Sequence, residues 1–215
     1  MPQSALSASQ PDAIHAAKAT LRAKLRQRRA EAALANGAAI AAVAAERFMA
    51  GIPLRQGFVV AGYWPMGDEL DVRPLLQRLR AECGAGILLP VSPPPGQPLT
   101  FRLWDGAAAS LRPGRYGILE PDPAAPALIP DMIIVPLLGF DARGGRLGMG
   151  AGYYDATLAA LRQQQAVLAV GYAFAVQQVP AVPCRQEDQD LDWVVTERGA
   201  ISCRIEPGDG QESGV

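Results

Sequence analysis

The stretch DMIIVPLLGFDARGGRLGMGAGYYD, residues 131–155, joins an apolar run to a glycine-rich segment and then to the start of a helix. Residues 131–140 predict a strand buried on both faces, because nearly every position carries an apolar side chain. Residues 153–165 predict a helix. Apolar strands that alternate with helices indicate a mostly parallel sheet, and such sheets bind ligands beyond the carboxyl ends of their strands. The glycines therefore fall where a site is expected.

The same alternation continues on both sides of this stretch. Further strands are predicted at 58–64, 86–91, 99–104, 166–174 and 191–197, and further helices at 11–36, 38–50 and 72–83. Residues 105–130 are rich in Gly, Pro and Ala and predict a long connection. We expect one α/β domain over residues 11–206, with flexible tails at 1–10 and 207–215.

Composition narrows the class of protein. The chain has 215 residues, is 49% hydrophobic and carries a net charge of −1, which argues against general binding of nucleic acid or an anionic membrane. Three cysteines, Cys83, Cys184 and Cys203, give neither a disulfide framework nor a zinc-ligand pattern. With no signal peptide or membrane span evident, we expect a cytoplasmic protein. His15 is the only histidine, so histidine-based catalysis is not expected.

The glycine segment matches neither standard nucleotide motif. It lacks the Gly-Lys-Ser/Thr of a P-loop, and its G-x-G-x-G spacing departs from the dinucleotide fingerprint. Gly148, Gly150 and Gly152 leave backbone N–H groups open to an anion, and a helix N-terminus follows at Tyr153. Arg146 adds a cation suited to phosphate. Asp155 is either a helix N-terminal charge or a ligand for the magnesium that accompanies a nucleotide.

The first predicted helix carries a second group of candidates. Lys18 and Arg22 lie four residues apart and therefore share one face, where an anion could bind between them. The alternative is a solvated basic surface. Leu21 and Leu25 form an adjacent apolar strip that could dock this helix on the rest of the protein.

The segment YWPMGDELD, residues 63–71, follows a predicted strand. Trp64 and Met66 offer a flat apolar surface, and Glu69 places a carboxylate beside it. This combination suits a flat heterocycle with N–H donors. The alternative is that Asp68, Glu69 and Asp71 are first-turn charges of the next helix.

Together these segments resemble the 5-formyltetrahydrofolate cyclo-ligase family, also called methenyltetrahydrofolate synthetases, over about residues 17–197. The matching stretches are DMIIVPLLGFDARGGRLGMGAGYYD (131–155), KATLR (18–22), YWPMGDELDV (63–72), LPVSPPPGQPLTFRLW (89–104), YGILEP (116–121), GYAFAVQQVP (171–180) and EDQDLDWVVTE (187–197). The resemblance implies a three-layer α/β/α domain of Rossmann-like type with a mostly parallel sheet. It also implies conversion of 5-formyltetrahydrofolate and ATP, with Mg²⁺, to 5,10-methenyltetrahydrofolate, ADP and phosphate.

The resemblance assigns roles by position. The expected ATP-binding residues are Lys18, Arg22, Arg146, Leu147, Gly148, Met149, Gly150, Ala151, Gly152, Tyr153 and Tyr154. The expected substrate-binding residues are Trp64, Glu69 and Gly148 to Gly152. Arg146 and Gly150 are the expected catalytic residues, and Asp155 and Asp188 the expected metal ligands.

Three positions depart from the family pattern: Met149, Ala151 and Glu187 stand where other residue types are frequent. They motivate an alternative, a non-catalytic nucleotide- or folate-binding relative with the same fold. An RNA-binding module that uses the basic helix is disfavoured by the net charge and by the lack of stacking aromatics near that helix. We expect a monomer whose partners are small molecules.

Overall fold

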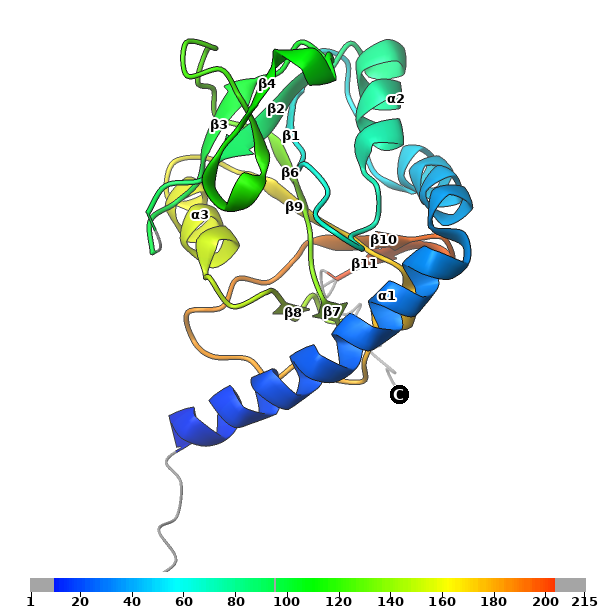
Figure 1. The fold of residues 1–215 in the computed structure, drawn as a ribbon, viewed down its shortest axis with the longest axis vertical. Helices are drawn as coiled ribbons and strands as arrows, with labels where there is room; N and C mark the ends of the chain where they lie inside the picture. The colour runs from blue at the N-terminus through cyan, green and yellow to red at the C-terminus, as the bar shows by residue number, and fades with distance from the viewer. Residues whose placement is uncertain (1–9, 95, 204–215) are drawn as a thin grey trace, which may run out of the picture.

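The computed structural model describes residues 10–94 and 96–203 (Figure 1). Its first element, α1 (Gln10–Gly51), already includes the last residue of the predicted N-terminal tail. The other residues of that tail, 1–9, and the predicted C-terminal tail, 207–215, lie outside the described residues. Within the described ranges, no helix is both long and apolar enough to cross a membrane.

Seven strands form the central sheet in the order β11-β10-β9-β6-β1-β2-β3. The strands are β1 (Val59–Ala61), β2 (Gly86–Val91), β3 (Thr100–Leu103), β6 (Met132–Val135), β9 (Leu168–Tyr172), β10 (Trp193–Thr196) and β11 (Gly199–Ser202). The inner strands pair in parallel, and only the edge strands β3 and β11 are antiparallel to their neighbours. The prediction of a mostly parallel sheet is confirmed.

Helices cover both faces of this sheet, as Figure 1 shows. Strand side chains alternate between the two faces, so each strand contributes to two separate hydrophobic clusters. On one face Phe48 of α1 and Leu75 of α2 (Arg73–Cys83) pack with Ile134. On the other, Leu158 of α3 (Tyr153–Arg162) packs with Ile133. The three-layer α/β/α fold is confirmed.

α1 corresponds to the two helices predicted at 11–36 and 38–50. Its backbone breaks at Asn36, where φ is −164° and ψ is 39°, one residue before the glycine expected to end the first helix. The part after the break packs beside α2, whereas the part before it runs along the lower edge of the molecule (Figure 1). The part of α1 after Asn36 thus contributes to the hydrophobic core, and the part before it covers a different region of the protein.

The prediction of a single strand over 131–140 is wrong. β6 ends at Val135, because Pro136 has no N–H to continue the ladder with β9. The chain then enters a separate two-stranded sheet of β7 (Gly139–Phe140) and β8 (Arg146–Leu147). This extra hairpin delivers the glycine segment to the start of α3.

The predicted connection at 105–130 also contains regular structure. β4 (Leu111–Pro113) and β5 (Leu119–Pro121) pair antiparallel, and 3-10 turns lie at Ala108–Ser110 and Arg115–Gly117. Each strand has only three residues, too few for a clear alternation of apolar and polar side chains. A further 3-10 turn at Ala175–Gln177 and the edge strand β11 were likewise not predicted.

Candidate active site

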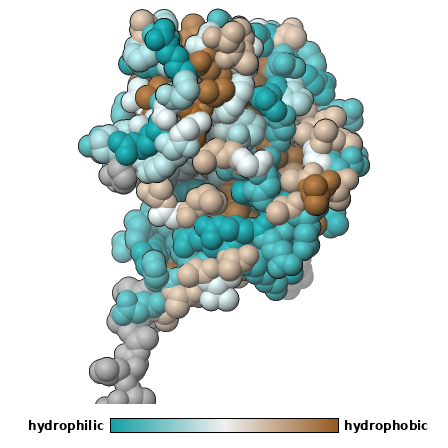
Figure 2. Space-filling model, in the orientation of Figure 1, coloured by the Kyte–Doolittle hydropathy of each residue, from teal (hydrophilic) through white to brown (hydrophobic). Residues whose placement is uncertain are grey.

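The main cavity of the described structure has a volume of about 710 Å³ and lies beyond the carboxyl ends of the central strands. Strand order explains its position. In the sheet, β1 lies between β2 and β6. The chain order runs outward from this point in opposite directions, so the segments that leave β1 and β6 diverge and open a crevice between them. The first part of α1, the start of α3 and Tyr116 of the connection complete the walls. Figure 2 shows this face hollowed above α1, whose hydrophilic residues line the lower rim.

All residues predicted for the site line this one cavity. They are Lys18, Arg22, Trp64, Glu69, Arg146, Leu147, Gly148, Met149, Gly150, Ala151, Gly152, Tyr153, Tyr154, Asp155 and Asp188. They come from four segments far apart in the sequence, which the fold brings together around one cavity.

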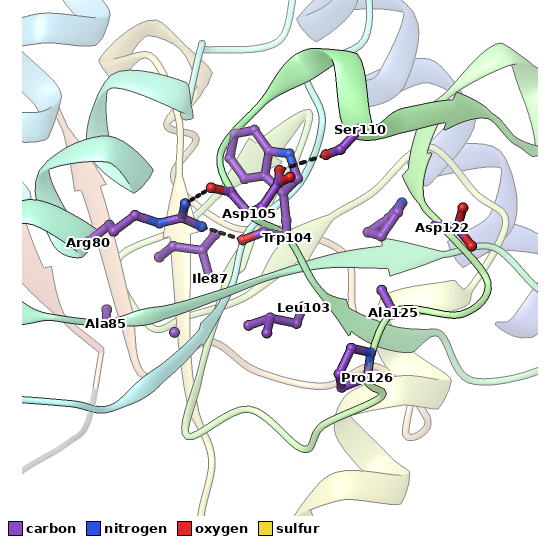
Figure 3. A pocket seen from close by; sticks show the side chains of 12 residues that line it. Arg80, Ala85, Ile87, Leu103, Trp104, Asp105, Ser110, Asp122, Ala125 and Pro126 are labelled. Atoms are coloured by element: carbon purple, nitrogen blue, oxygen red, sulfur yellow. Dashed lines mark hydrogen bonds between the residues drawn. The ribbon is translucent and has the colours of Figure 1, made fainter.

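A second hollow of about 510 Å³ lies at the β3 side of the sheet (Figure 3). Its polar groups are engaged within the protein. The Arg80 guanidinium donates to the backbone carbonyls of Trp104 and Asp105, and Asp105 accepts a hydrogen bond of 2.6 Å from Ser110. Asp122 pairs with Arg112. This hollow therefore offers a ligand little beyond apolar contact.

The first part of α1 is held against the cavity by the apolar strip that the sequence predicted. Leu25 is fully buried and packs with Leu147, and Leu21 joins the same cluster. Lys18, only 8% exposed, forms an ion pair with Asp188. Arg22 donates from Nε to the carbonyl oxygen of Gly148 at 2.9 Å. The alternative of a solvated basic surface is therefore wrong for Lys18 and Arg22.

The glycine segment lies between β8 and α3. Gly150 has φ +110° and Gly152 has φ +72°, a region in which residues with side chains are strained, and Gly152 is the N-cap of α3. Met149 is 52% exposed, so this segment borders the open part of the cavity. The glycine segment and the N-terminus of α3 line the same cavity, a combination that suits an anion.

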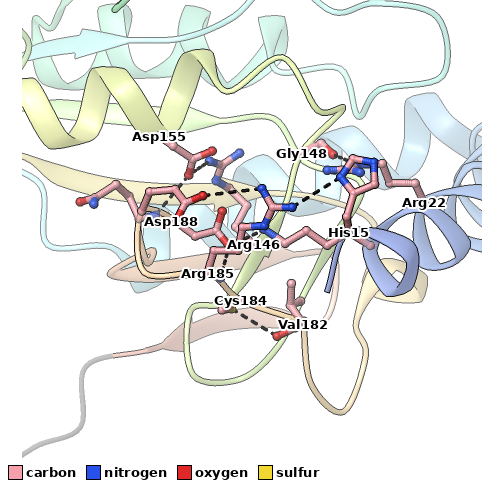
Figure 4. A network of polar contacts seen from close by, with 12 residues as sticks. His15, Arg22, Arg146, Gly148, Asp155, Val182, Cys184, Arg185 and Asp188 are labelled. Atoms are coloured by element: carbon pink, nitrogen blue, oxygen red, sulfur yellow. Dashed lines mark hydrogen bonds and ion pairs between the residues drawn. The ribbon is translucent and has the colours of Figure 1, made fainter. Parts of the chain in front are cut away.

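Two ion pairs link the predicted cations to the predicted metal ligands, and Figure 4 shows Arg146, Asp155 and Asp188 in one network of polar contacts. Arg146 Nη2 lies 2.5 Å from Asp155 Oδ1, and Lys18 pairs with Asp188. The backbone N–H of Gln189 donates to Asp155 Oδ1 at 3.1 Å, which joins the Asp188 segment to α3. Lys18 and Arg146 are therefore each neutralised by a carboxylate within the cavity.

The two carboxylates fit a magnesium ion that brings other ligands with it. Magnesium is commonly held by one or two carboxylates together with substrate phosphates. Across the described residues there is no cluster of three or more His, Cys, Asp or Glu side chains that could hold a metal unaided. Asp155 and Asp188 are thus suited to a metal that arrives with a phosphate ligand.

Glu69 and Trp64 form the opposite wall. Glu69 Oε2 accepts a hydrogen bond of 3.0 Å from the backbone N–H of Met66 within the same loop. Because α2 begins only at Arg73 and has no acidic residue in its first turn, the alternative that Glu69 is a first-turn charge is wrong. Asp71 lies just before the helix and accepts a hydrogen bond from the Arg73 N–H. Trp64 packs edge-on against Trp104, with ring centroids 5.9 Å apart.

Burial sets the electrostatics of this wall. It raises the pKa of the Glu69 carboxyl above its usual value, while the Met66 N–H and the charge of Arg29 act in the opposite direction. Burial also raises the pKa of the Tyr154 hydroxyl, and Glu69 adds to that increase. The carboxylate is therefore poorly solvated, which suits a group that accepts hydrogen bonds from a ligand.

Several lining residues were not predicted as part of the site. Arg185 and Tyr116 line the cavity. His15 is exposed but also lines it, with Nδ1 3.5 Å from Nη2 of Arg185 (Figure 4). Arg29 contacts Glu69 from α1. Only Arg29 carried a usable signal: it lies seven residues after Arg22, so helical spacing places both on the same side.

The fold and cavity define a class of protein. It is an α/β protein whose switch-point crevice places cations, glycine amides and carboxylates on one side, and an aromatic wall with a buried carboxylate on the other. Such a crevice is suited to an anionic phosphate ligand beside a flat polar heterocycle.

Comparison with known proteins makes the class specific. The chain belongs to the 5-formyltetrahydrofolate cyclo-ligase family, whose model matches residues 14–197. It is therefore an enzyme of the cyclo-ligase type, and the resemblance noted in the sequence is confirmed.

Individual relatives agree with this assignment. The chain is 35% identical over 157 residues to 5-formyltetrahydrofolate cyclo-ligase of Escherichia coli K12, an alignment that covers 71% of this chain and 85% of the relative. It is 35% identical over 156 residues to the corresponding protein of Mycolicibacterium smegmatis, covering 69% and 78%. The solution structure of 5,10-methenyltetrahydrofolate synthetase from Aquifex aeolicus superposes with a TM-score of 0.73 at 26% identity, covering 91% of this chain and 97% of that one.

Proposed function

We propose that this chain converts 5-formyltetrahydrofolate and ATP to 5,10-methenyltetrahydrofolate, ADP and phosphate, in a reaction that requires Mg²⁺. One observation carries the proposal: the residues predicted for phosphate and those predicted for the pterin line the same cavity of about 710 Å³. The family and the names of the relatives support the folate conversion. The nucleotide and the metal are supported by the chemistry of the residues present.

Lys18, Arg22 and Arg146 form the phosphate side with the glycine segment. Phosphoryl transfer depends mainly on positioning and on positive charge around the transferred group. Gly150 and Gly152 let the reacting groups approach the backbone closely, and the α3 N-terminus adds its partial positive charge. Arg146 lies beside Gly148 and pairs with Asp155, which suits it to the transferred phosphate.

Asp155 and Asp188 would hold the magnesium. Bound there with the nucleotide, Mg²⁺ would neutralise phosphate charge in the transition state. The same two carboxylates now neutralise Arg146 and Lys18. Binding of the nucleotide would therefore exchange carboxylate for phosphate at both cations.

Glu69 and Trp64 would hold the pterin. The pterin edge presents adjacent N–H donors, and a carboxylate accepts two of them at once. The Trp64 ring and the neighbouring Met66 supply the flat apolar surface against which the ring system lies.

The need for ATP follows from the substrate. The N5-formyl group is an amide, so its carbon is a poor electrophile, and ring closure would have to expel hydroxide. In the proposed reaction the formyl oxygen attacks the γ-phosphorus and ADP leaves. N10 then attacks the formyl carbon, the N10 proton is lost, and the oxygen departs with the phosphoryl group as phosphate.

The test is an absorbance assay, because the methenyl product absorbs in the near ultraviolet and 5-formyltetrahydrofolate does not. Purified protein, 5-formyltetrahydrofolate, ATP and Mg²⁺ should together give the band, and leaving out any one of them should abolish it. Release of ADP and phosphate in a 1:1 ratio with product checks the stoichiometry.

The departures at Met149, Ala151 and Glu187 make a binding protein without turnover the competing outcome. Calorimetric binding of both ligands without formation of the absorbance band would support that alternative and overturn the catalytic proposal.

A further inference from the structure

Arg29 is a buried cation that the proposed reaction does not use. It lies on α1, is 5% exposed, and points toward the loop that follows β1. Its Nη2 lies 2.5 Å from Asp68 Oδ1, and its Nη1 lies 3.8 Å from Glu69 Oε1. It does not line the cavity itself, so any effect on a ligand passes through these two carboxylates.

The hydrogen bonding of Arg29 is incomplete. Nε and Nη1 are buried and have no hydrogen-bond partner within the part of the chain that the structure describes. A buried guanidinium with unused donors is costly, because desolvation is not compensated by hydrogen bonds. Asp68 alone therefore explains the side chain poorly as a structural anchor. The unused Nη1 lies 3.8 Å from Glu69 Oε1, too far for a hydrogen bond but close enough for an ion pair.

Glu69 is placed between Arg29 and the cavity. Its Oε2 accepts the Met66 N–H, which fixes the carboxylate within its loop, and Oε1 faces Arg29. The same side chain lines the cavity. A cation behind a carboxylate that faces a ligand is an arrangement that keeps the carboxylate charged and oriented.

We propose that Arg29 is the positioning residue for Glu69 and holds it ionised and oriented for the N–H donors of the pterin. This inference rests on the proposed function, since it takes Glu69 to be the folate acceptor. It adds a specific consequence: α1 would contribute to the binding of both substrates. Lys18 and Arg22 would contact the phosphate, and Arg29 would position the Glu69 carboxylate that binds the folate.

The groups around Glu69 determine the direction of the pH effect. Arg29 on α1 favours its charged form, Asp68 beside it disfavours that form, and burial disfavours it most strongly. Its charge also contributes to the raised pKa values of the Tyr63 hydroxyl, which donates to the Leu70 carbonyl, and of the Tyr154 hydroxyl on α3. Removal of the Arg29 charge should raise the pKa of Glu69, and removal of the Asp68 charge should lower it.

The experiment measures affinity for 5-formyltetrahydrofolate by calorimetry from pH 5 to pH 8 in Arg29→Met, Arg29→Gln and Asp68→Asn. Because the charged carboxylate binds the ligand, affinity is lost as pH falls through the pKa of Glu69. In both Arg29 variants the midpoint of this loss should move up by about one pH unit, the lower end of the effect of an opposite charge at this distance. At a pH below the midpoint, this shift makes the affinity of the Arg29 variants about tenfold weaker than that of the wild type.

Asp68→Asn separates a charge effect from anchoring of the loop. It breaks the shorter contact of Arg29, so anchoring alone would make it behave like the Arg29 variants. The proposal expects its midpoint to stay in place or move down. Arg29→Gln removes the charge but retains an N–H donor for Asp68. It therefore serves as the test variant if circular dichroism shows that Arg29→Met does not fold. Arg47→Met, an exposed arginine of α1, is the matched control and should change nothing.

Two further measurements distinguish the proposals from each other. Glu69→Gln should itself weaken folate binding and remove its low-pH loss, and Arg29→Met should add little in that background. ATP affinity should be unchanged in every variant. Equal upward shifts in Arg29→Met and Asp68→Asn, or no shift in either Arg29 variant, would overturn the role of Arg29. Unchanged folate binding in Glu69→Gln would instead overturn the pterin assignment on which it rests.

Discussion

Glu69 illustrates how a single residue gains its chemistry from its surroundings. A carboxylate at the surface would be fully hydrated and would gain little by exchanging water for a ligand. Burial raises the pKa of Glu69, and its remaining acceptor capacity faces the cavity. Hydrogen bonds from the N–H donors of a ligand therefore compensate for the hydration that the carboxylate lost on folding.

We expect Glu69→Gln to weaken binding of 5-formyltetrahydrofolate by about tenfold to a hundredfold, since hydrogen bonds to a charged group contribute about 1.5–3 kcal/mol. The variant retains the shape of the side chain but loses its charge and one acceptor. ATP affinity measured without folate should hardly change. Calorimetry of both ligands checks this, with the exposed Glu82→Gln as control. A parallel loss for ATP would indicate general damage instead.

Gly150 is the residue at which backbone geometry and close approach coincide. Its φ is +110°, and a Cβ added there would lie 3.6 Å from Cζ of Arg22. We expect Gly150→Val to abolish turnover in a folded protein, because a β-branched residue resists this conformation and fills the space beside Arg22, the cation proposed to bind phosphate.

Gly57→Val provides the control for strain alone. Gly57 has φ +70°, a Cβ added there would meet no atom within 4 Å, and the residue lies outside the cavity. Both variants should lose about 1–3 kcal/mol of stability from the strained backbone. Only Gly150→Val should lose activity; turnover in a folded Gly150→Val would refute the close-approach argument.

At the scale of elements, α1 has two tasks that the break at Asn36 separates. After Asn36 it contributes Ala44 and Phe48 to the core, and before it Leu25 docks the basic segment beside the cavity. A change at Lys18 or Arg22 therefore acts on a part of the helix that contributes little to the main core.

We expect Lys18→Ala and Arg22→Ala mainly to raise the KM for ATP, and the double variant to raise it further. Their side chains reach the phosphate side of the cavity through Asp188 and the Gly148 carbonyl. Steady-state kinetics with varied ATP at saturating folate checks the expectation. Lys24→Ala, an exposed lysine of the same helix, is the control. If the double variant keeps normal ATP kinetics, these residues do not bind phosphate.

The elements also show what the sequence could predict. The apolar strands, the helix at α3 and three of the candidate site segments were predicted because each has a local pattern of its own, whereas Asp188 was assigned by the family resemblance alone. The β4–β5 hairpin and the edge strand β11 were not, since strands of three or four residues carry too little periodicity, and the end of β6 at Pro136 was missed because the apolar run continues beyond it. Arg29 was seen only as part of a basic helix, because its pairing with Asp68 depends on tertiary packing across 39 residues.

At the scale of the whole molecule, the cavity balances its own charges. Lys18 pairs with Asp188 and Arg146 with Asp155, so two cations and two carboxylates from distant segments neutralise each other. ATP alone must compete with both carboxylates for the cations. When Mg²⁺ accompanies ATP, the carboxylates gain a cation of their own, and this competition is relieved. Mg²⁺ and ATP should therefore promote each other's binding.

The last prediction follows from this exchange and concerns Asp155→Asn. In the wild type, calorimetry should show that Mg²⁺ strengthens ATP binding, and thermal unfolding should show a larger rise in Tm with both ligands than with ATP alone. In Asp155→Asn, Arg146 loses its charged partner, so ATP without Mg²⁺ should bind more tightly than in the wild type. The gain on adding Mg²⁺ should shrink, and turnover should fall far more than folate affinity. Comparison of the two proteins at each Mg²⁺ concentration cancels the effect of Mg²⁺ on free ATP. If the variant keeps the full Mg²⁺ effect and normal turnover, Asp155 is only a charge at the start of α3, which would contribute about 0.3–1 kcal/mol to stability.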